Sequence, residues 1–276
     1  MHNKKKPSLQ SIGMFDSGLG GLTVMQQVMR ILPNEKIIYF GDTARVPYGS
    51  KSSETIVRYS IENAIFLMEK NIKVLVIACS TASACAMDKL QQIFNIPVIG
   101  AIEPGVERAL EVTKNGRIAV LGTKATINSG IYQREIQRHR PDAFVKAIAC
   151  PLFVPLVEER FASHPVAKLI VKEYLASLHQ EGIDTIVLGC THYPLLHQLI
   201  KEELGDGVTI VDSAITCAEK VDAVLRSNSI YSEHTEGQKK HHQYFVSDDP
   251  EKFRSLGQEF LGMPLERVEA ASLFTV

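Results

Sequence analysis

The sequence predicts an α/β fold in which two pseudo-symmetric α/β units with mostly parallel sheets enclose an active site in the cleft between them. Short apolar runs rich in Val and Ile alternate with helix-length amphipathic segments along the chain, a pattern typical of parallel strands covered by helices. Two of these runs end alike, in "VLVIACSTAS" (74–83) and "TIVLGCTHYP" (185–194). The likeness indicates internal duplication, with a thiol at the carboxyl end of one strand in each half.

Most of the predicted strands lack polar alternation, as expected for strands that are buried on both faces. They cover residues 11–16, 36–41, 73–78, 96–100, 117–122, 143–149, 184–189 and 208–212. The predicted helices lie between them and cover residues 53–70, 81–94, 104–114, 125–139, 164–181 and 213–226. Ligands of such sheets bind outside the carboxyl ends of the strands, so both thiols are placed where a ligand is expected.

Composition narrows the class of protein. The 276 residues suffice for one large or two ordinary domains, and 30 basic against 31 acidic residues argue against a nucleic-acid partner. No segment approaches the roughly 20 apolar residues of a membrane span, and no secretory signal follows the basic N-terminus. Five cysteines without framework spacing do not predict a disulfide scaffold. We therefore expect a cytoplasmic protein with reduced thiols and no membrane association.

Cys79 and Cys190 are the strongest candidates for chemistry. Cys79 ends its strand where Ser80 or Thr81 can cap a helix, and a helix N-terminus favours a nearby thiolate. Cys190 repeats the arrangement ahead of a second helix start. Cysteine is also a common small apolar core residue, which is the favoured interpretation for the thiols that lie within helical patterns, Cys85 and Cys217.

His192 follows Cys190 closely and raises two further possibilities. Structural zinc sites usually pair their ligands as C-x₂₋₄-C and H-x₃₋₅-H, and neither pattern occurs here, so we predict no metal. A Cys–His nucleophile pair with His192 as the base is conceivable, but one nucleophile would leave Cys79 unexplained.

Two loops complete a predicted pocket. "DSGLGGLTV" (16–24) and "GDTARVPYGSK" (41–51) follow strands and can present backbone N–H groups to an anion. A simple turn is an equally good interpretation of the first loop and the favoured local interpretation of the second. Asp16 would accept an ammonium group, and donors for carboxylates would come from Ser17, Gly49, Thr81 and Thr191. With two thiols, such a pocket suits proton transfer at a carbon of a small amino acid diacid, one thiolate removing a proton and the other thiol donating one.

The segments that carry these residues resemble those of the glutamate racemases, cofactor-independent enzymes of the aspartate/glutamate racemase superfamily. The resemblance runs from about residue 11 to near the C-terminus and rests on "FDSGLGGLTV", "YFGDTARVPYG", "IACSTASA", "ACPLFVPLVEE", "LGCTHYPLL" and "VDSA" in this order. It implies two α/β domains related by an approximate twofold axis. The first would comprise residues 1–103 and 213–276, and the second residues 104–212.

The resemblance also implies roles for residues of the pocket. Cys79 would be the base that acts on D-glutamate and Cys190 the base that acts on L-glutamate, each serving as the acid in the reverse direction. Asp16 would assist Cys79, whereas His192 and Glu158 would lie on the side of Cys190. Substrate contacts are expected from Asp16, Ser17, Tyr48, Gly49, Ser80, Thr81, Thr126, Thr191 and His192.

One residue departs from the family pattern, which commonly has Cys-Asn-Thr where this chain has Cys79-Ser80-Thr81. An aspartate racemase of the same superfamily is therefore one alternative, and a non-catalytic amino acid-binding protein on the same scaffold is another. A pyridoxal-phosphate racemase would need a Schiff-base Lys and a phosphate cup, and no Lys has such a context, so we expect no cofactor. The resemblance further implies a homodimer that supplies D-glutamate for peptidoglycan synthesis.

Overall fold

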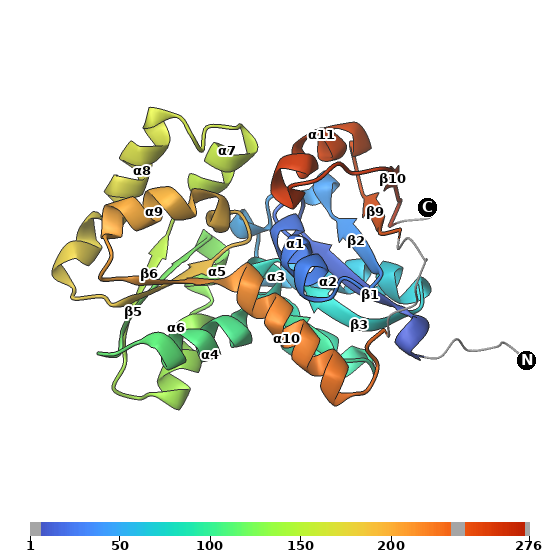
Figure 1. The fold of residues 1–276 in the computed structure, drawn as a ribbon, viewed down its shortest axis with the longest axis horizontal. Coiled ribbons are helices and arrows are strands. Elements are labelled where there is room, and N and C mark those ends of the chain that lie inside the picture. The colour runs from blue at the N-terminus through green and yellow to red at the C-terminus, as the bar shows by residue number, and fades with distance from the viewer. Residues whose placement is uncertain (1–6, 233–240, 274–276) are drawn as a thin grey trace, which may run out of the picture.

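The computed structural model describes residues 7–232 and 241–273 and contains two parallel sheets (Figure 1). The first sheet, in the order β10–β9–β2–β1–β3–β4, comprises β1 (Ser11–Asp16), β2 (Ile37–Gly41), β3 (Ile72–Ile77), β4 (Val98–Gly100), β9 (Gln243–Val246) and β10 (Val268–Ala270). The second sheet, in the order β6–β5–β7–β8, comprises β5 (Arg117–Gly122), β6 (Phe144–Ala149), β7 (Thr185–Gly189) and β8 (Thr209–Asp212).

The two sheets repeat one topology, which confirms the predicted fold class. Strands β2–β1–β3–β4 have the same order and direction as β6–β5–β7–β8. Each of the eight predicted strands is present within two residues of its expected limits. The apolar runs identify them because β1, β3 and β7 are buried along their whole length. Since β3 and β7 occupy equivalent places in the two sheets, Cys79 and Cys190, which follow them, lie at equivalent strand ends.

Helices surround both sheets in the described residues. They are α1 (Leu22–Ile31), α2 (Ser53–Glu69), α3 (Ser80–Ile93), α4 (Ile102–Val112), α5 (Lys124–Asn128), α6 (Ile131–His139), α7 (Phe153–Glu158), α8 (Pro165–Leu175), α9 (His197–Leu204), α10 (Ser213–Ser227) and α11 (Pro250–Leu261). Short 3₁₀ turns are η1 (Pro7–Leu9), η2 (Thr43–Arg45), η3 (Tyr48–Ser50), η4 (Ala176–Gln180) and η5 (Tyr193–Leu196).

Two helix predictions are wrong in extent. The single helix expected over 125–139 is divided into α5 and α6 by Gly130, whose φ of 66° is left-handed and interrupts the α-helical backbone. The helix expected over 164–181 ends at Leu175 and continues as the 3₁₀ turn η4. Strands β9 and β10 and helix α11, which follow the last predicted element, were not predicted.

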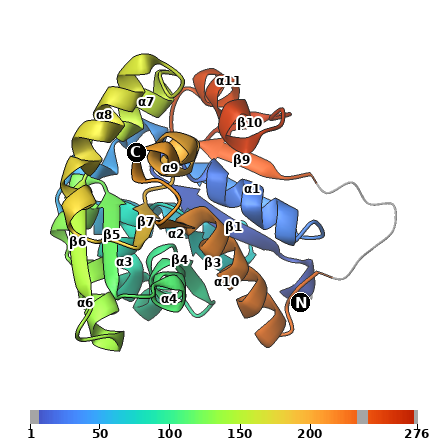
Figure 2. The ribbon, with the colours of Figure 1, turned by 60° about the vertical axis from the view of Figure 1, so that its left-hand side comes forward.

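The chain passes between the two sheets twice. It leaves the first sheet after β4, where α4 begins, and returns between β8 and α10. Helix α10 then packs against both α4 and α1, and Figure 2 shows it running beside α1. Buried apolar residues of both halves form one continuous cluster. Across residues 7–232 and 241–273, no helix has the length and apolar character that crossing a membrane requires.

Candidate active site

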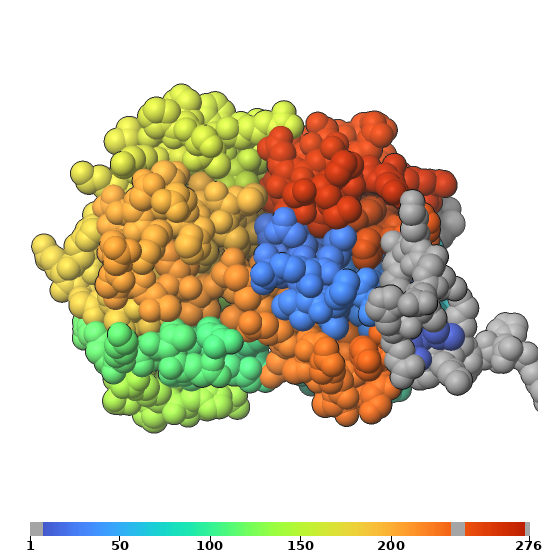
Figure 3. Space-filling model, in the orientation of Figure 1, coloured from blue at the N-terminus to red at the C-terminus, as the bar shows by residue number. Residues whose placement is uncertain are grey.

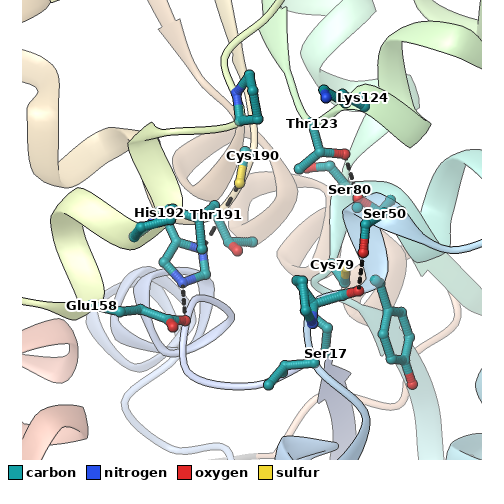
Figure 4. Close-up of a pocket in the computed structure, with 18 of the residues that line it drawn as sticks. Ser17, Ser50, Cys79, Ser80, Thr123, Lys124, Glu158, Cys190, Thr191 and His192 are labelled. Carbon is teal, nitrogen blue, oxygen red and sulfur yellow. Dashed lines mark hydrogen bonds and ion pairs between the residues drawn. The ribbon is translucent and has the colours of Figure 1, made fainter. Parts of the chain in front are cut away.

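A cavity of about 430 Å³ lies where the carboxyl ends of the two sheets face each other (Figure 4). This is the position at which open parallel sheets bind ligands. Ten residues predicted for the site line the cavity: Ser17, Tyr48, Gly49, Cys79, Ser80, Thr81, Glu158, Cys190, Thr191 and His192. Figure 4 shows Cys79 with Ser17 on one side and Cys190 with His192 on the other.

Cys79 occupies the N-cap position of α3 directly after β3, and its side chain is only 5% exposed. Burial, followed by the charge of the nearby Asp16, raises the pKa of the Cys79 thiol to about 12. The N–H of Ala82 and the side chain of Ser17 favour the thiolate but do not outweigh these effects. Cys79 is therefore a protonated thiol at neutral pH, able to donate a proton.

Cys190 lies next to a buried histidine, His192, which is paired with the half-buried Glu158. Its Sγ lies 3.8 Å from Nδ1 of His192, and Nε2 of His192 lies 2.9 Å from Oε1 of Glu158 (Figure 4). Burial lowers the pKa of His192, but the bonds to Cys190 and Glu158 raise it to about 10. The ring is thus a cation at neutral pH and lies directly beside the sulfur of Cys190.

Asp16 lies near Cys79 but does not line the cavity. Its side chain is fully buried at the end of β1, where Oδ2 accepts a hydrogen bond of 2.9 Å from the N–H of Gly18. Burial raises the pKa of Asp16, and the charge of His192 opposes that rise. Its other oxygen, Oδ1, makes no hydrogen bond to any residue that the structure describes. In this state Asp16 acts on Cys79 through its charge.

Thr126 is also set back from the cavity, within a cluster of three threonines. The hydroxyl of Thr81 lies 2.9 Å from that of Thr123 and 3.1 Å from that of Thr126. Thr123, which the sequence analysis missed, lines the cavity and caps α5, whereas Thr126 is 1% exposed. The internal symmetry offered a signal, because Thr123 follows β5 as Ser17 follows β1.

Tyr48 lines the cavity, but its hydroxyl is held by the protein. It donates to Oδ2 of Asp42 and accepts a hydrogen bond of 3.0 Å from Nδ2 of Asn63. Arg45 joins the same network through Asp42 at 2.8 Å and Oδ1 of Asn63 at 3.0 Å. Sequence analysis missed Asp42, Arg45 and Asn63 as supports of this loop, although the first two lie within the segment 41–51 that it singled out.

The remaining lining residues were not predicted. Most are apolar, and the whole group comprises Val46, Pro47, Ser50, Lys124, Pro151, Val154, Pro155 and Glu159. Ser80, in contrast, carries a buried Oγ that makes no hydrogen bond within the described chain. An unpaired buried hydroxyl carries a desolvation cost that a bound polar group can remove. The site therefore combines two thiols, an imidazolium and an unpaired hydroxyl in a largely apolar pocket.

Comparison with known proteins gives a consistent result. The Asp/Glu/Hydantoin racemase family model matches residues 12–221. A glutamate racemase of Geobacter metallireducens is 52% identical over 96% of this chain and 97% of its own, and one of Neisseria meningitidis is 48% identical over 95% and 96%. The structure of a Francisella tularensis glutamate racemase in complex with D-glutamate has a TM-score of 0.90 and 39% identity, covering 96% of this chain and 98% of that one.

An aspartate racemase homologue from Pyrococcus horikoshii is more distant. Its structure has a TM-score of 0.58 and 18% identity over 79% of this chain and 100% of its own, a likeness that shows the fold alone. The resemblance inferred from the sequence segments is confirmed by relatives that match nearly the whole chain. This chain belongs to the Asp/Glu/Hydantoin racemase family and, within it, to the glutamate racemases.

Proposed function

We propose that this protein interconverts L- and D-glutamate by two-base proton transfer at Cα, with Cys79 and Cys190 as the two bases. The observation that carries the proposal is that both thiols line one cavity from equivalent strand ends. Starting from L-glutamate, the Cys190 thiolate takes the Cα proton and the C–H bond breaks. The S–H of Cys79 then gives its proton to the opposite face of the carbanion, leaving a Cys190 thiol and a Cys79 thiolate. D-glutamate runs through the same steps in reverse.

The surroundings of the two thiols suit the direction that starts from L-glutamate. Cys79 is a protonated thiol next to Asp16 and can serve as the acid, whereas Cys190 faces the cationic ring of His192. That cation would stabilise the negative charge on Cys190 when it acts as the base. A positioned acid or base typically contributes about 10²–10⁴-fold to the rate, and the remainder must come from stabilising the carbanion electrostatically.

Substrate binding would use donors already directed at the cavity. The residues Ser17, Gly49, Ser80, Thr81 and Thr191 line it. Their hydroxyls and backbone N–H groups would bind the two carboxylates. His192 and Glu158 would hold Cys190 in its reactive state, and Asp16 would assist Cys79 and attract the substrate ammonium. Tyr48 would contribute its ring and the backbone of its loop, because its hydroxyl is bonded to Asp42 and Asn63.

The proposal is tested by circular dichroism of purified protein with L-glutamate, D-glutamate and L-aspartate, without added pyridoxal phosphate. We expect both glutamate enantiomers to lose optical signal to the racemic value, and L-aspartate to react much more slowly. Faster loss with aspartate would favour the aspartate racemase. No change with any of the three, from folded protein with all thiols titratable, would refute the racemase and favour an amino acid-binding protein.

Ser80 provides the test of substrate binding. It is shorter than the Asn that the family commonly carries, and its Oγ is buried and unpaired within the described residues. Ser80→Asn should therefore lower KM for glutamate several-fold while changing kcat little, because an amide reaches further into the cavity and offers two donors. A KM that stays unchanged, measured by the same optical assay, would contradict a binding role for this position.

The cellular setting belongs to the same proposal. D-glutamate made by this enzyme would enter peptidoglycan, and the thiol chemistry requires a reducing compartment such as the cytoplasm. All five cysteines are free thiols, which supports that location. A homodimer is supported by the resemblance to glutamate racemases, and sedimentation velocity at micromolar concentration would test it.

A further inference from the structure

Helix α11 reaches the active site from the far end of the chain. The ring of Phe260, near the end of α11, meets the imidazole of His192 with centroids 5.4 Å apart and planes at 87°. Both side chains are buried, with 3% of Phe260 and 5% of His192 exposed. This edge-to-face contact is a favourable arrangement for two aromatic rings. The contact joins α11, which packs beside the first sheet, to His192, which lies next to Cys190 at the end of the second sheet.

A second contact ties the same helix to the segment that follows Glu158. Oε1 of Glu259 lies 2.7 Å from Nε of Arg160, which stands two residues beyond Glu158 at the end of α7. A cavity of about 160 Å³ also has both Glu158 and Lys252 of α11 among its lining residues. Figures 1 and 3 show α11, in red, against the yellow-green segment that contains α7. Helix α11 therefore contacts His192 directly and lies beside the segment that carries Glu158.

We propose that Phe260 is a positioning residue that holds the imidazole of His192 between Cys190 and Glu158. The inference rests on the proposed function of Cys190. A ring that faces Cys190 through Nδ1 and Glu158 through Nε2 loses both bonds if it rotates about its own side-chain bonds. The Phe260 ring fills the space into which such a rotation would carry it and keeps water from the imidazole. Helix α11 thereby sustains the thiolate on one side of the cavity only.

The helix carries its own control. Phe253, seven residues earlier, is 1% exposed and packs on Tyr39 with ring centroids 5.9 Å apart, so Phe253→Leu should weaken the docking of α11 to a similar degree without touching His192. The titratable groups that act on His192 are Cys190, Glu158 and Asp16. Phe260→Leu leaves all of them in place.

The experiment measures alkylation by iodoacetamide from pH 5 to pH 10, with Cys79 and Cys190 quantified separately by peptide mass spectrometry. In Phe260→Leu we expect the midpoint of the Cys190 profile to move upward by roughly half to one pH unit, the shift that loss of one aromatic pair supports. Cys79, with its pKa of about 12, should react slowly over this range and to the same extent in every variant, and the Cys190 midpoint should not move in Phe253→Leu. If Phe260→Leu only made Cys190 more accessible to iodoacetamide, the alkylation rate would rise at every pH and the midpoint of the Cys190 profile would stay in place.

The same data can overturn the inference. An unmoved Cys190 midpoint in Phe260→Leu, or an equal shift of that midpoint in Phe253→Leu, would mean that Phe260 only fills space. Thermal unfolding of each variant checks that it is folded, and Phe260→Met, whose longer and more flexible side chain adapts better to the site, replaces Phe260→Leu if the latter is not. Alkylation needs no turnover, so a protein that fails to racemise glutamate would refute the proposed function without deciding this one.

Discussion

Cys79 lies near a carboxylate and Cys190 near an imidazolium, although the two thiols end equivalent strands. The difference comes from one residue at the end of β1 and one that follows β7: Asp16 is buried near Cys79, whereas His192 turns back toward Cys190. Opposite neighbouring charges favour opposite protonation states. Racemisation removes a proton from one face of Cα and adds another to the opposite face. It requires such a difference, because one thiol must begin as the base and the other as the acid.

The His192–Glu158 bond can be tested through the pH dependence of stability. Because the pKa of His192 is raised to about 10 in the folded protein, its contribution is fully present below the unfolded value near 6.5 and is lost as pH rises through about 10. Glu158→Gln removes the anionic partner and should cost about 2 kcal/mol of unfolding free energy at pH 6.5. Urea denaturation of both proteins should find this difference shrinking between pH 8 and 10.5.

A control separates this pair from an exposed one. Glu203→Gln removes the partner of His179, which lies 3.0 Å away with 49% of its side chain exposed. Its cost should stay below about 1 kcal/mol because solvent screens the pair. A Glu158→Gln cost that is equal at pH 6.5 and 10.5 would contradict a charged His192.

Single residues were predicted unevenly, for physical reasons. Cys79, Cys190 and His192 could be found because strand ends and helix starts leave a trace in the sequence. The setback of Asp16 and Thr126 from the cavity could not, since it depends on how far each side chain extends after its strand. The bonding of the Tyr48 hydroxyl depends on Asn63, which a helix brings back from fifteen positions away.

At the scale of elements, the segment from Asp42 to Ser50 forms one wall of the cavity. Asp42 is fully buried and accepts hydrogen bonds from Arg45, Tyr48 and Ser247. Arg45 also pairs with Glu62 of α2. The segment has little regular structure of its own beyond η2 and η3, so these bonds fix where its backbone faces the substrate.

Tyr48→Phe tests this support. Removing the hydroxyl leaves Asp42 short of one donor and Asn63 short of one acceptor, so we expect a loss of roughly 1–3 kcal/mol in unfolding free energy. The loosened loop should raise KM for glutamate more than it lowers kcat. Tyr59→Phe is the control, because Tyr59 packs against Tyr48 with centroids 5.8 Å apart and the change keeps its ring. A raised KM with full stability would show instead that the Tyr48 hydroxyl binds substrate directly.

Elements with a long apolar signal were predictable, and the last three were not. Strands β9 and β10 have four and three residues, too few for a run of apolar residues to stand out. Helix α11 did carry a signal, since Asp249 caps it, Pro250 opens it and Phe253 and Phe260 share a face. That Phe260 meets His192 depends on tertiary packing, which no local pattern records.

At the scale of the whole molecule, the cavity is closed by contacts between the two halves. The hydroxyl of Thr23 donates to the carbonyl of Thr191 at 2.9 Å on one side. On the other side Thr81 bonds to Thr123 at 2.9 Å. We propose that residues 1–103 with 213–276 and residues 104–212 are two domains that separate to admit substrate and close to exclude water. The boundary at 103/104 lies in the first turn of α4.

Gly20→Ala tests whether this closure matters. A Cβ at Gly20 would lie 2.2 Å from Oγ1 of Thr191 and 2.5 Å from Nδ1 of His192, so the halves could not meet as they do. A displacement of about 1 Å can cost roughly 10²-fold in rate, and we expect at least that loss in kcat/KM. Gly105→Ala is the matched control, because its nearest neighbour would be 3.7 Å away. Gly20→Ala with normal kcat/KM would contradict the need for this contact.

The most direct test of two-base racemisation follows deuterium in the first few per cent of turnover. Protiated L-glutamate is incubated with the enzyme in D₂O, and both enantiomers are separated and analysed by mass spectrometry. We predict that the D-glutamate formed carries one solvent deuterium at Cα while the remaining L-glutamate stays protiated, because Cys190 removes the proton and Cys79 supplies another. D-glutamate that keeps the original proton, or L-glutamate that gains deuterium as fast as product forms, would contradict the two-thiol mechanism.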